Sequence, residues 1–387
     1  MNQTSAQRFE MRATVVESID AINRDEWNAL FPGELENWNY YRAVEKSGLP
    51  GFEWLYFCVR DDYRLCAVVP AFVSDYALDT TMSGFWRRVT NAITRVFPRF
   101  LRVRMLGLGS PVAEVCHLGF ASDLDPQSRC EALDAILAAV EVRARACKAR
   151  LLAIKDASAA QDALWTTAAH AHGLRRQPGL PTATLKIDFD SVDEYLRSLS
   201  RATRRDLRRK LKTSAKLRVE WRTQIDDIRD DVMCLYRATL ANAQYSFEEL
   251  TEDYFSGVLR ELGSEAVCAT YWLDERLVAF NLVLRDDTRM IDKFLGMDNI
   301  LARSYNIYFC SWIENVRYCI DHHLSEYQSG QGLHREKLRL GSTLRANWLW
   351  YRHRNRILDT ILALFERLAR LDRYDPDLAA LVGGQQR

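Results

Sequence analysis

The sequence predicts an α/β protein of two domains, each a mixed, mostly antiparallel β-sheet flanked by helices, with a further helix at the C-terminal end. Three observations lead to this prediction. The 387 residues suit two cores of ordinary size better than one. Along the chain, segments in which apolar and polar residues alternate, as in strands, are interspersed with segments that have the period of about 3.6 residues of helices. In the second half, three strand-like segments follow one another across two short acidic turns, as in an antiparallel meander.

The first domain is expected over residues 1–190. Its strand-like segments are 12–17, 53–60, 64–73, 151–155 and 182–189. Its helix-like segments are 20–30, 37–47, 131–148 and 160–172. Asp61-Asp62 joins two of the strands as a tight turn, and the later strands and helices alternate in the βαβ order of a mixed sheet.

The second domain is expected over residues 191–355. A strand at 217–222 precedes helices at 225–240 and 251–262. The meander follows at 266–273, 276–285 and 289–297, then a loop at 298–304 and a helix at 305–322. Residues 356–387 are expected to form a helix that packs on the body and a loose tail. A peripheral membrane anchor or a dimer seam is the alternative role of that helix.

The composition limits the possible classes of protein. The formal net charge is +1, so the chain as a whole has no field that would attract nucleic acid or membrane. Nine cysteines without a CxxC pair form neither a disulfide framework nor a zinc pattern, and a cytoplasmic location fits them. No signal-peptide core and no run of about 18 uncharged apolar residues is found. His322-His323 is not expected to bind a metal, because adjacent positions point apart.

Two segments concentrate basic residues. Residues 80–113 contain no acid. Within them, arginines lie opposite an apolar and aromatic stripe from Phe85 to Phe100, which predicts a helix packed on the core with a solvated arginine face. A helix on anionic lipid or against an acidic partner, such as an acyl carrier protein, is the alternative. Residues 197–218 carry ten Lys or Arg against one acid, Asp206. They form either a solvated linker helix or an anion site for coenzyme A phosphates, a carrier-protein helix or RNA.

The candidate site lies where the last strand after the meander ends. The stretch comprises a strand-like segment at 324–328, a turn at 329–332 and a helix at 334–340, closed by Gly341. Lys337 and His334 therefore lie on one helical turn, just beyond a strand that carries Glu326 and Gln328. Strand ends that face a short helix are common places for binding and catalytic residues.

This stretch resembles a known signature. The order of tyrosine, glycine-rich turn, lysine and glycine across Tyr327 to Gly341 is similar to the strand, turn and FK-x-x-FG motif of the Fem-type aminoacyl transferases, relatives of the GNAT acyltransferases and of their CelD-like branch. Glu336 stands here in place of the phenylalanine, and Ser342 follows the glycine. The order of elements in the second domain also resembles the GNAT fold. The resemblance implies tandem GNAT domains, the first being a degenerate copy.

The resemblance also implies a function. By it, the protein is an N-acyltransferase that moves an acyl group from acyl-CoA or an acyl carrier protein to an amine of a small molecule, sugar or peptide. The donor is a co-substrate, and no permanently bound cofactor is expected. A Fem-like transferase using charged tRNA, with residues 197–218 as the RNA surface, is one alternative. A non-catalytic binding protein is the other, since Glu336 is unusual and the common pyrophosphate loop is absent.

Two groups of site residues follow. In GNAT enzymes a helix N-terminus meets the pyrophosphate of the donor, and the resemblance places that end here. This cofactor side comprises Arg303, Ser304, Tyr305, Asn306 and Gln328. Lys337 corresponds to the lysine that acts at the reacting carbonyl in Fem-type enzymes.

Other candidates come from the residue types. Glu326 and His334 are able to accept the proton of an amine, directly or through water. Asp292-Lys293, on the strand before, either lines the same cleft or forms a cross-strand ion pair. Tyr245 lies in a polar loop suited to binding the acceptor.

Overall fold

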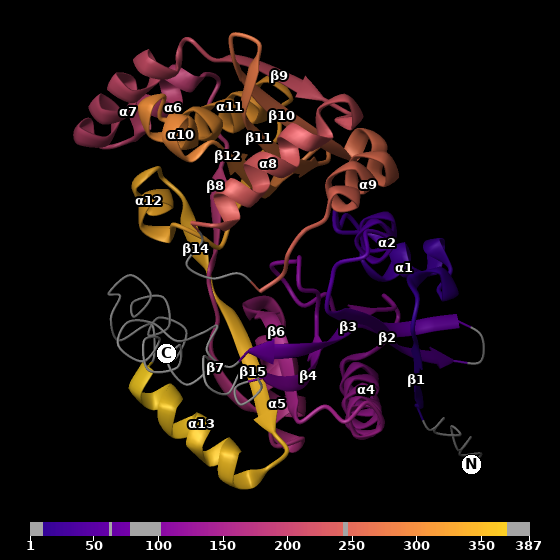
Figure 1. Cartoon of the computed structure of the whole chain (residues 1–387). Helices are drawn as coiled ribbons and strands as arrows, with labels where there is room; N and C mark the ends of the chain where they lie inside the picture. Colours follow the sequence, from indigo (N-terminus) through magenta and orange to yellow (C-terminus); the bar gives the residue numbers. More distant parts are fainter. Residues whose placement is uncertain (1–10, 62–63, 78–101, 243–246, 370–387) are drawn as a thin grey trace, which may run out of the picture.

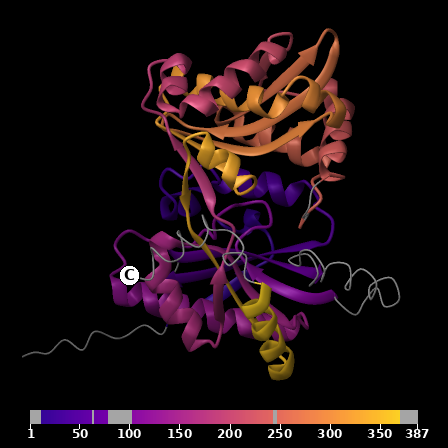
Figure 2. The same ribbon diagram turned by 90° about the vertical axis from the view of Figure 1, so that its left-hand side faces the viewer.

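The computed structural model of the chain describes residues 11–61, 64–77, 102–242 and 247–369. Two sheets lie one above the other, each flanked by helices (Figures 1 and 2). Most strands of the first sheet come from the first half of the chain, and most strands of the second come from the second half. The predicted mixed α/β architecture is confirmed.

The first sheet has the strand order β1-β2-β3-β4-β6-β15-β7, and the short β5 pairs with β3. Its strands are β1 Ala13–Val16, β2 Phe52–Asp61, β3 Arg64–Ala77, β4 Arg102–Leu108, β5 Gly119–Phe120, β6 Leu151–Ser158, β7 Arg175–Pro178 and β15 Asn347–His353. β4 and β6 run parallel, whereas the other neighbours are antiparallel. Helices α4 (Pro126–Ala146) and α5 (Asp162–Ala171) cover one face, and α1 (Arg24–Leu30) and α2 (Trp38–Lys46) pack on the other.

The second sheet has the strand order β14-β8-β13-β12-β11-β10-β9. Its strands are β8 Thr182–Lys186, β9 Arg218–Arg222, β10 Ala266–Leu273, β11 Arg276–Arg285, β12 Arg289–Met297, β13 Glu326–Gly330 and β14 Thr343–Arg345. Its helices are α6 Val192–Ser198, α7 Arg201–Ser214, α8 Arg229–Leu240, α9 Glu252–Leu262, α10 Asn299–Ser304, α11 Ile307–Asp321 and α12 His334–Arg339. α8 and α9 pack on one face, and α6, α7 and α11 pack on the other. Helix α13 (Arg356–Ala369) follows β15.

Polar side chains fix where several helices begin. Asn23 and Asn37 accept hydrogen bonds from backbone N–H groups in the first turns of α1 and α2. Asp125 does the same for α4, and Pro126 then suits the first helical position because its missing N–H would have no partner there. Each such cap stabilises its helix by about 1 kcal/mol.

Two strands cross between the halves, and this corrects the sequence assignment. β8, expected in the first domain, pairs with β13 and β14 of the second sheet. β15, expected in the second domain, pairs with β6 and β7 of the first sheet. Both views show these strands running between the two bodies (Figures 1 and 2). Alternation in the sequence predicts a strand but not its partner. The bounds 1–190, 191–355 and 356–387 stay a prediction.

One further expectation needs correction. Residues 298–304, expected as a loop, contain α10, because Asp298 caps it by accepting from the N–H groups of Ile300 and Leu301. The basic helix expected with an apolar stripe from Phe85 to Phe100 lies outside the described residues. Residues 102–108 form β4, with Leu106 and Leu108 in the core under α4.

Candidate active site

The site begins where two parallel strands of the second sheet part. β12 pairs with β13 only as far as Ile291 and Gln328. A bulge leaves Lys293 of β12 without a partner on β11. Because side chains alternate along a strand, Asp292 and Tyr327 point toward α11, whereas Lys293 and Gln328 point toward the first half. The diverging strands therefore present polar groups on both sides.

Helix α12 places Lys337 against the end of β13. The residue is 5% exposed, and its Nζ donates to the carbonyl oxygens of Ser329 and, at 3.0 Å, of Gly330. An ammonium has three N–H donors, so one remains for another acceptor. Burial lowers the pKa of Lys337, and the charges of Asp292 and Glu114 oppose that shift. Lys337 is thus a buried donor held by carbonyl groups and not by an ion pair.

Glu114, in the loop after β4, lies near Lys337, and Gly330 lies beside both side chains. Glu114 Oε2 accepts a hydrogen bond from Gln328 Nε2 at 3.0 Å. A Cβ added to Gly330 would lie 2.8 Å from Glu114 Oε1 and 3.6 Å from Lys337 Nζ. Gly330 also has a φ of 88°, which favours glycine. Burial raises the pKa of the Glu114 carboxyl, although Lys293 and Lys337 oppose the shift.

On the α11 side, Asp292 belongs to a closed ring of hydrogen bonds. Asn281 Nδ2 donates to Asp292 Oδ1 at 2.7 Å, and Tyr327 OH donates to Asp292 Oδ2 at 3.0 Å. Asn315 Nδ2 completes the ring by donating to Asn281 Oδ1 and Tyr327 OH, both at 2.8 Å. Burial raises the pKa of Asp292 despite these donors. The ring fixes β12, β13 and α11 together next to Lys337.

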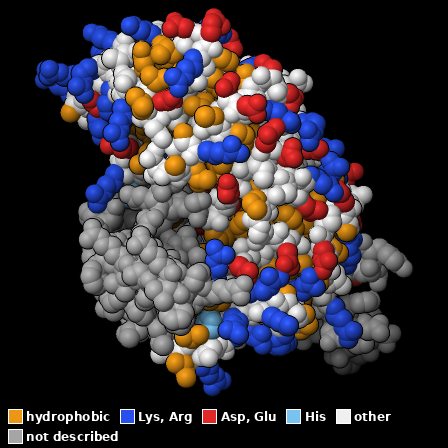
Figure 3. All heavy atoms as spheres, in the orientation of Figure 1, with side chains coloured by type: hydrophobic (Ala, Val, Ile, Leu, Met, Phe, Trp, Pro, Cys, Tyr) orange, Lys and Arg blue, Asp and Glu red, His pale blue; other side chains and the backbone are white. Residues whose placement is uncertain are grey.

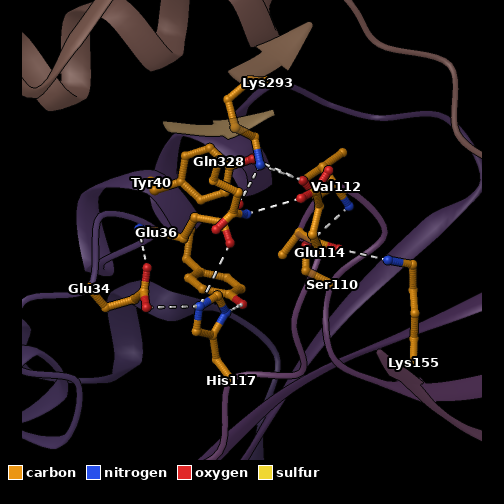
Figure 4. A network of polar contacts seen from close by, with 12 residues as sticks. Glu34, Glu36, Tyr40, Ser110, Val112, Glu114, His117, Lys155, Lys293 and Gln328 are labelled. Carbon is orange, nitrogen blue, oxygen red and sulfur yellow. Dashed lines mark hydrogen bonds and ion pairs between the residues drawn. The ribbon is translucent and has the colours of Figure 1, made fainter. Parts of the chain in front are cut away.

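On the other side, Lys293 joins the second sheet to the first half (Figure 4). Its side chain and that of Glu36 are each 4% exposed and form an ion pair, and Nζ donates to the Val112 carbonyl at 2.8 Å. Although burial alone would lower the pKa of Lys293, the Glu36 charge raises it above its ordinary value. The Lys293 Nζ also lies 4.9 Å from the centre of the Tyr40 ring.

Below Glu36 in Figure 4, His117 lies close to the carboxylates of Glu34 and Glu36. His117 Nδ1 is 2.7 Å from Tyr41 OH, while Nε2 is 3.8 Å from Glu34 Oε2 and 3.7 Å from Glu36 Oε2. Arg289 also donates to Glu34, at 2.9 Å. Burial would raise the pKa of Glu34, but His117 and Arg289 hold it at about 2. This cluster fastens the loop before α2 to β12.

Lys155 of β6 bounds the polar region on the right of Figure 4. Its Nζ donates to the Ala113 carbonyl at 2.7 Å and pairs with Asp156. Asp156 is buried and has a φ of 57°, a conformation unusual for a residue other than glycine. Burial raises the pKa of nearby Glu248, with Lys155 opposing.

The structure separates the predicted base candidates. Glu326 forms an ion pair with Arg345, and its side chain keeps 26% exposure. His334 is the half-buried first residue of α12. Asp292 and Gln328 lie beside the Lys337 region, on opposite sides of the diverging strands. Tyr245 lies outside the described residues.

The predicted cofactor side lies at the start of α11. Arg303 and Ser304 are exposed at the end of α10, and Tyr305 packs on the apolar cluster under β10 and β11. Asn306 caps α11 with a φ of 51°, and its Nδ2 donates to Thr213 Oγ1 at 2.8 Å. Their role toward a donor stays a prediction.

Sequence reasoning missed the residues that the first half contributes. These are Glu34, Glu36, Glu114, His117 and Lys155. One signal was present for Glu114, because it is the first acid after the acid-free run 80–113 and follows a turn at the end of β4. Nothing local pairs Glu36 with Lys293, which are far apart in sequence.

Two further findings concern the described residues alone. No group of three or more His, Cys, Asp or Glu side chains there is arranged to hold a metal ion. No helix within them combines the length and apolar character needed to cross a membrane.

Comparisons with known proteins give both a fold and a family. The crystal structure of FemX superposes with a TM-score of 0.56 at 14% identity, covering 90% of this chain and 99% of that one. A tandem GNAT protein from the clavulanic acid biosynthesis pathway gives 0.53 at 13% identity, covering 89% and 99%. The predicted tandem GNAT fold is confirmed. A FemAB-like family model, described as peptidoglycan biosynthesis/recognition, matches residues 18–373. No curated protein matches significantly.

Proposed function

The chain belongs to the FemAB-like family, and from this premise we propose that it transfers an acyl or aminoacyl group from an activated donor to an amine. The observation that supports this proposal is the pair of side chains, Lys337 and Glu114, that both lie beside Gly330. Lys337 keeps one N–H free of its two carbonyl partners, and Glu114 is a carboxylate with a raised pKa. They come from opposite halves of the chain.

The two groups suit the two demands of the reaction. The amine forms a C–N bond to the donor carbonyl, and the amine proton moves to the Glu114 carboxylate. The ester or thioester bond then breaks, and the leaving alcohol or thiol departs with that proton. Lys337 donates to the oxyanion that forms on the carbonyl. Such a donor is worth about 10²–10³ in rate, and a base with its pKa raised toward neutrality is effective at physiological pH.

The identities of the donor and acceptor are finer proposals. A thioester donor, acyl-CoA or acyl carrier protein, is our first choice, with its phosphate end near Arg303 to Asn306 at the start of α11. Charged tRNA is the alternative donor, supported by the basic helix α7 and by family membership. The family description supports an amine of a peptidoglycan-type peptide or sugar as the acceptor.

Transfer assays with mass-spectrometric detection test the proposal. The donors are short- and long-chain acyl-CoA, acyl carrier protein and aminoacyl-tRNA, each with a lysine-containing muropeptide. We expect one donor to give an amide product, and Lys337→Ala to reduce its rate by about 10²–10³. Lys46→Ala, which removes an exposed lysine on α2, is the matched control. Product formation that Lys337→Ala and Glu114→Gln leave unchanged would contradict the proposal, as would no product from any donor.

A further inference from the structure

Helix α7 carries a stripe of cations that the candidate active site does not use. Arg201, Arg205, Arg208 and Lys212 are all exposed and recur at the spacing i, i+4, i+7 and i+11. This spacing places them on one face of the helix, along about 16 Å of its length. We call these four residues the α7 stripe. Figure 3 shows Lys and Arg side chains gathering over α7, at the upper left of the molecule.

The stripe has little charge compensation of its own. Within the described part of the chain, no carboxylate forms an ion pair with Arg201, Arg205 or Lys212, and Arg208 only approaches exposed Asp193 at 3.6 Å. The one acid of the helix, Asp206, pairs instead with Arg209, Lys210 and Arg339. Like charges in a row with so little compensation repel one another, so an acidic surface laid along them would relieve that repulsion.

The opposite face of α7 is anchored to the elements of the candidate site. Leu207 is fully buried, and Lys210 lies 3.4 Å from the centre of the Phe309 ring on α11. Thr213 accepts a hydrogen bond from Asn306 at the start of α11. Asp206 pairs at 2.6 Å with Arg339, two residues beyond Lys337 on α12. A partner on the stripe would therefore lie on the outer side of α7, with this helix between the partner and α11 and α12.

The residue types on α6 and α7 indicate which kind of acidic partner fits the stripe. The only aromatic residue in 191–218 is Tyr195, which is buried, so no ring is offered to stack on RNA bases. The stripe has no exposed large apolar side chain to enter a membrane interface. Cations spaced by three and four residues match the spacing of acids along one face of a helix.

We propose that the α7 stripe docks an acidic helix of a carrier protein that delivers the activated acyl group to the Lys337 site. This inference rests on the proposed function, since it names the carrier of the donor. Charge pairs at such a surface act mainly on the association rate and weaken as salt increases.

The test measures docking without turnover. An acyl carrier protein with its phosphopantetheine arm is titrated by biolayer interferometry at low and physiological salt, beside total tRNA and phosphatidylglycerol vesicles. The variant Arg205→Glu with Lys212→Glu is compared with Arg145→Glu combined with Arg237→Glu. The control residues are exposed on α4 and α8, and the change in net charge is the same.

We expect the carrier protein to bind the parent chain, the stripe variant to bind it about tenfold more weakly, and the control variant to keep its affinity. Equal binding by the two variants, or no binding of the carrier protein, would overturn the inference. Loss of tRNA or vesicle binding alone in the stripe variant would assign the stripe to that ligand instead. Lys337→Ala should dock normally but fail to transfer, so failure of docking and failure of the proposed function are distinguishable.

Discussion

Two buried lysines of the second half show opposite uses of one residue type. Lys293 is paired with the buried Glu36, and this charge raises its pKa above the ordinary value although burial acts against it. Lys337 is held by two carbonyl oxygens, and burial lowers its pKa. Burial alone therefore does not define a reactive lysine, because both lysines are buried and their pKa values shift in opposite directions. The partner decides whether the ammonium is a structural counter-charge or a donor available to a substrate.

The largest expected effect is a difference in stability between variants of the two lysines. Lys293→Met should lower the free energy of unfolding by about 3–5 kcal/mol, because it leaves Glu36 buried without a counter-charge. Lys337 is held by carbonyl groups, so Lys337→Met leaves no carboxylate without its counter-charge. It should lower the free energy of unfolding less than Lys293→Met does, while abolishing transfer. Urea unfolding of both variants measures the difference. Similar losses of stability in the two variants would show that the two lysines do not differ in role. Combining Lys293→Met with Glu36→Gln should recover part of the stability that Lys293→Met loses.

The second effect concerns the carboxylates behind Lys293. Glu34 has a folded pKa of about 2 against an ordinary value of 4.5, so the stability it contributes is present above pH 4.5 and is lost as pH falls toward 2. The full contribution is about 3 kcal/mol. Unfolding measured between pH 2 and 6 should therefore depend less on pH in Glu34→Gln than in the parent. Parallel curves would show that His117 and Arg289 do not hold this carboxylate.

A smaller change tests the space beside Lys337. Gly330→Ala introduces a methyl group 2.8 Å from Glu114 Oε1, at a φ of 88°. We expect about 1–2 kcal/mol of lost stability from the backbone conformation, and a reduced rate because Glu114 must shift. Gly332→Ala, which meets nothing within 4 Å, is the control. Unchanged kinetics in Gly330→Ala would show that the position of Glu114 does not matter for transfer.

The smallest effect concerns the base predicted from sequence. Glu326 is paired with Arg345 near the surface, so Glu326→Gln should alter stability by less than about 1 kcal/mol. Its effect on the transfer rate should be slight beside that of Glu114→Gln. Steady-state kinetics of both variants decides between them. A loss with Glu326→Gln equal to that with Glu114→Gln would restore Glu326 as the base.

The amino-acid sequence determined the local elements and the position of Lys337 on a short helix after a strand. Hydrophobic periodicity and turn residues predicted the hairpin of β2 and β3, the meander of β10 to β12 and helix α11 closely. Lys337, on a short helix after a strand, was predicted from the same local patterns and from the family signature. These features depend on residues close together in the chain, which is why one sequence was enough.

The tertiary structure alone decided which strands pair and which charges meet. β8 and β15 each pair in the sheet of the other half. An alternating sequence predicts a strand, but it does not specify which neighbour that strand will pair with. Glu36 pairs with Lys293, and Glu114 lies near Lys337, across contacts between the halves that no spacing in the sequence encodes. Burial, which sets the pKa shifts of these groups, exists only once the two halves have packed together.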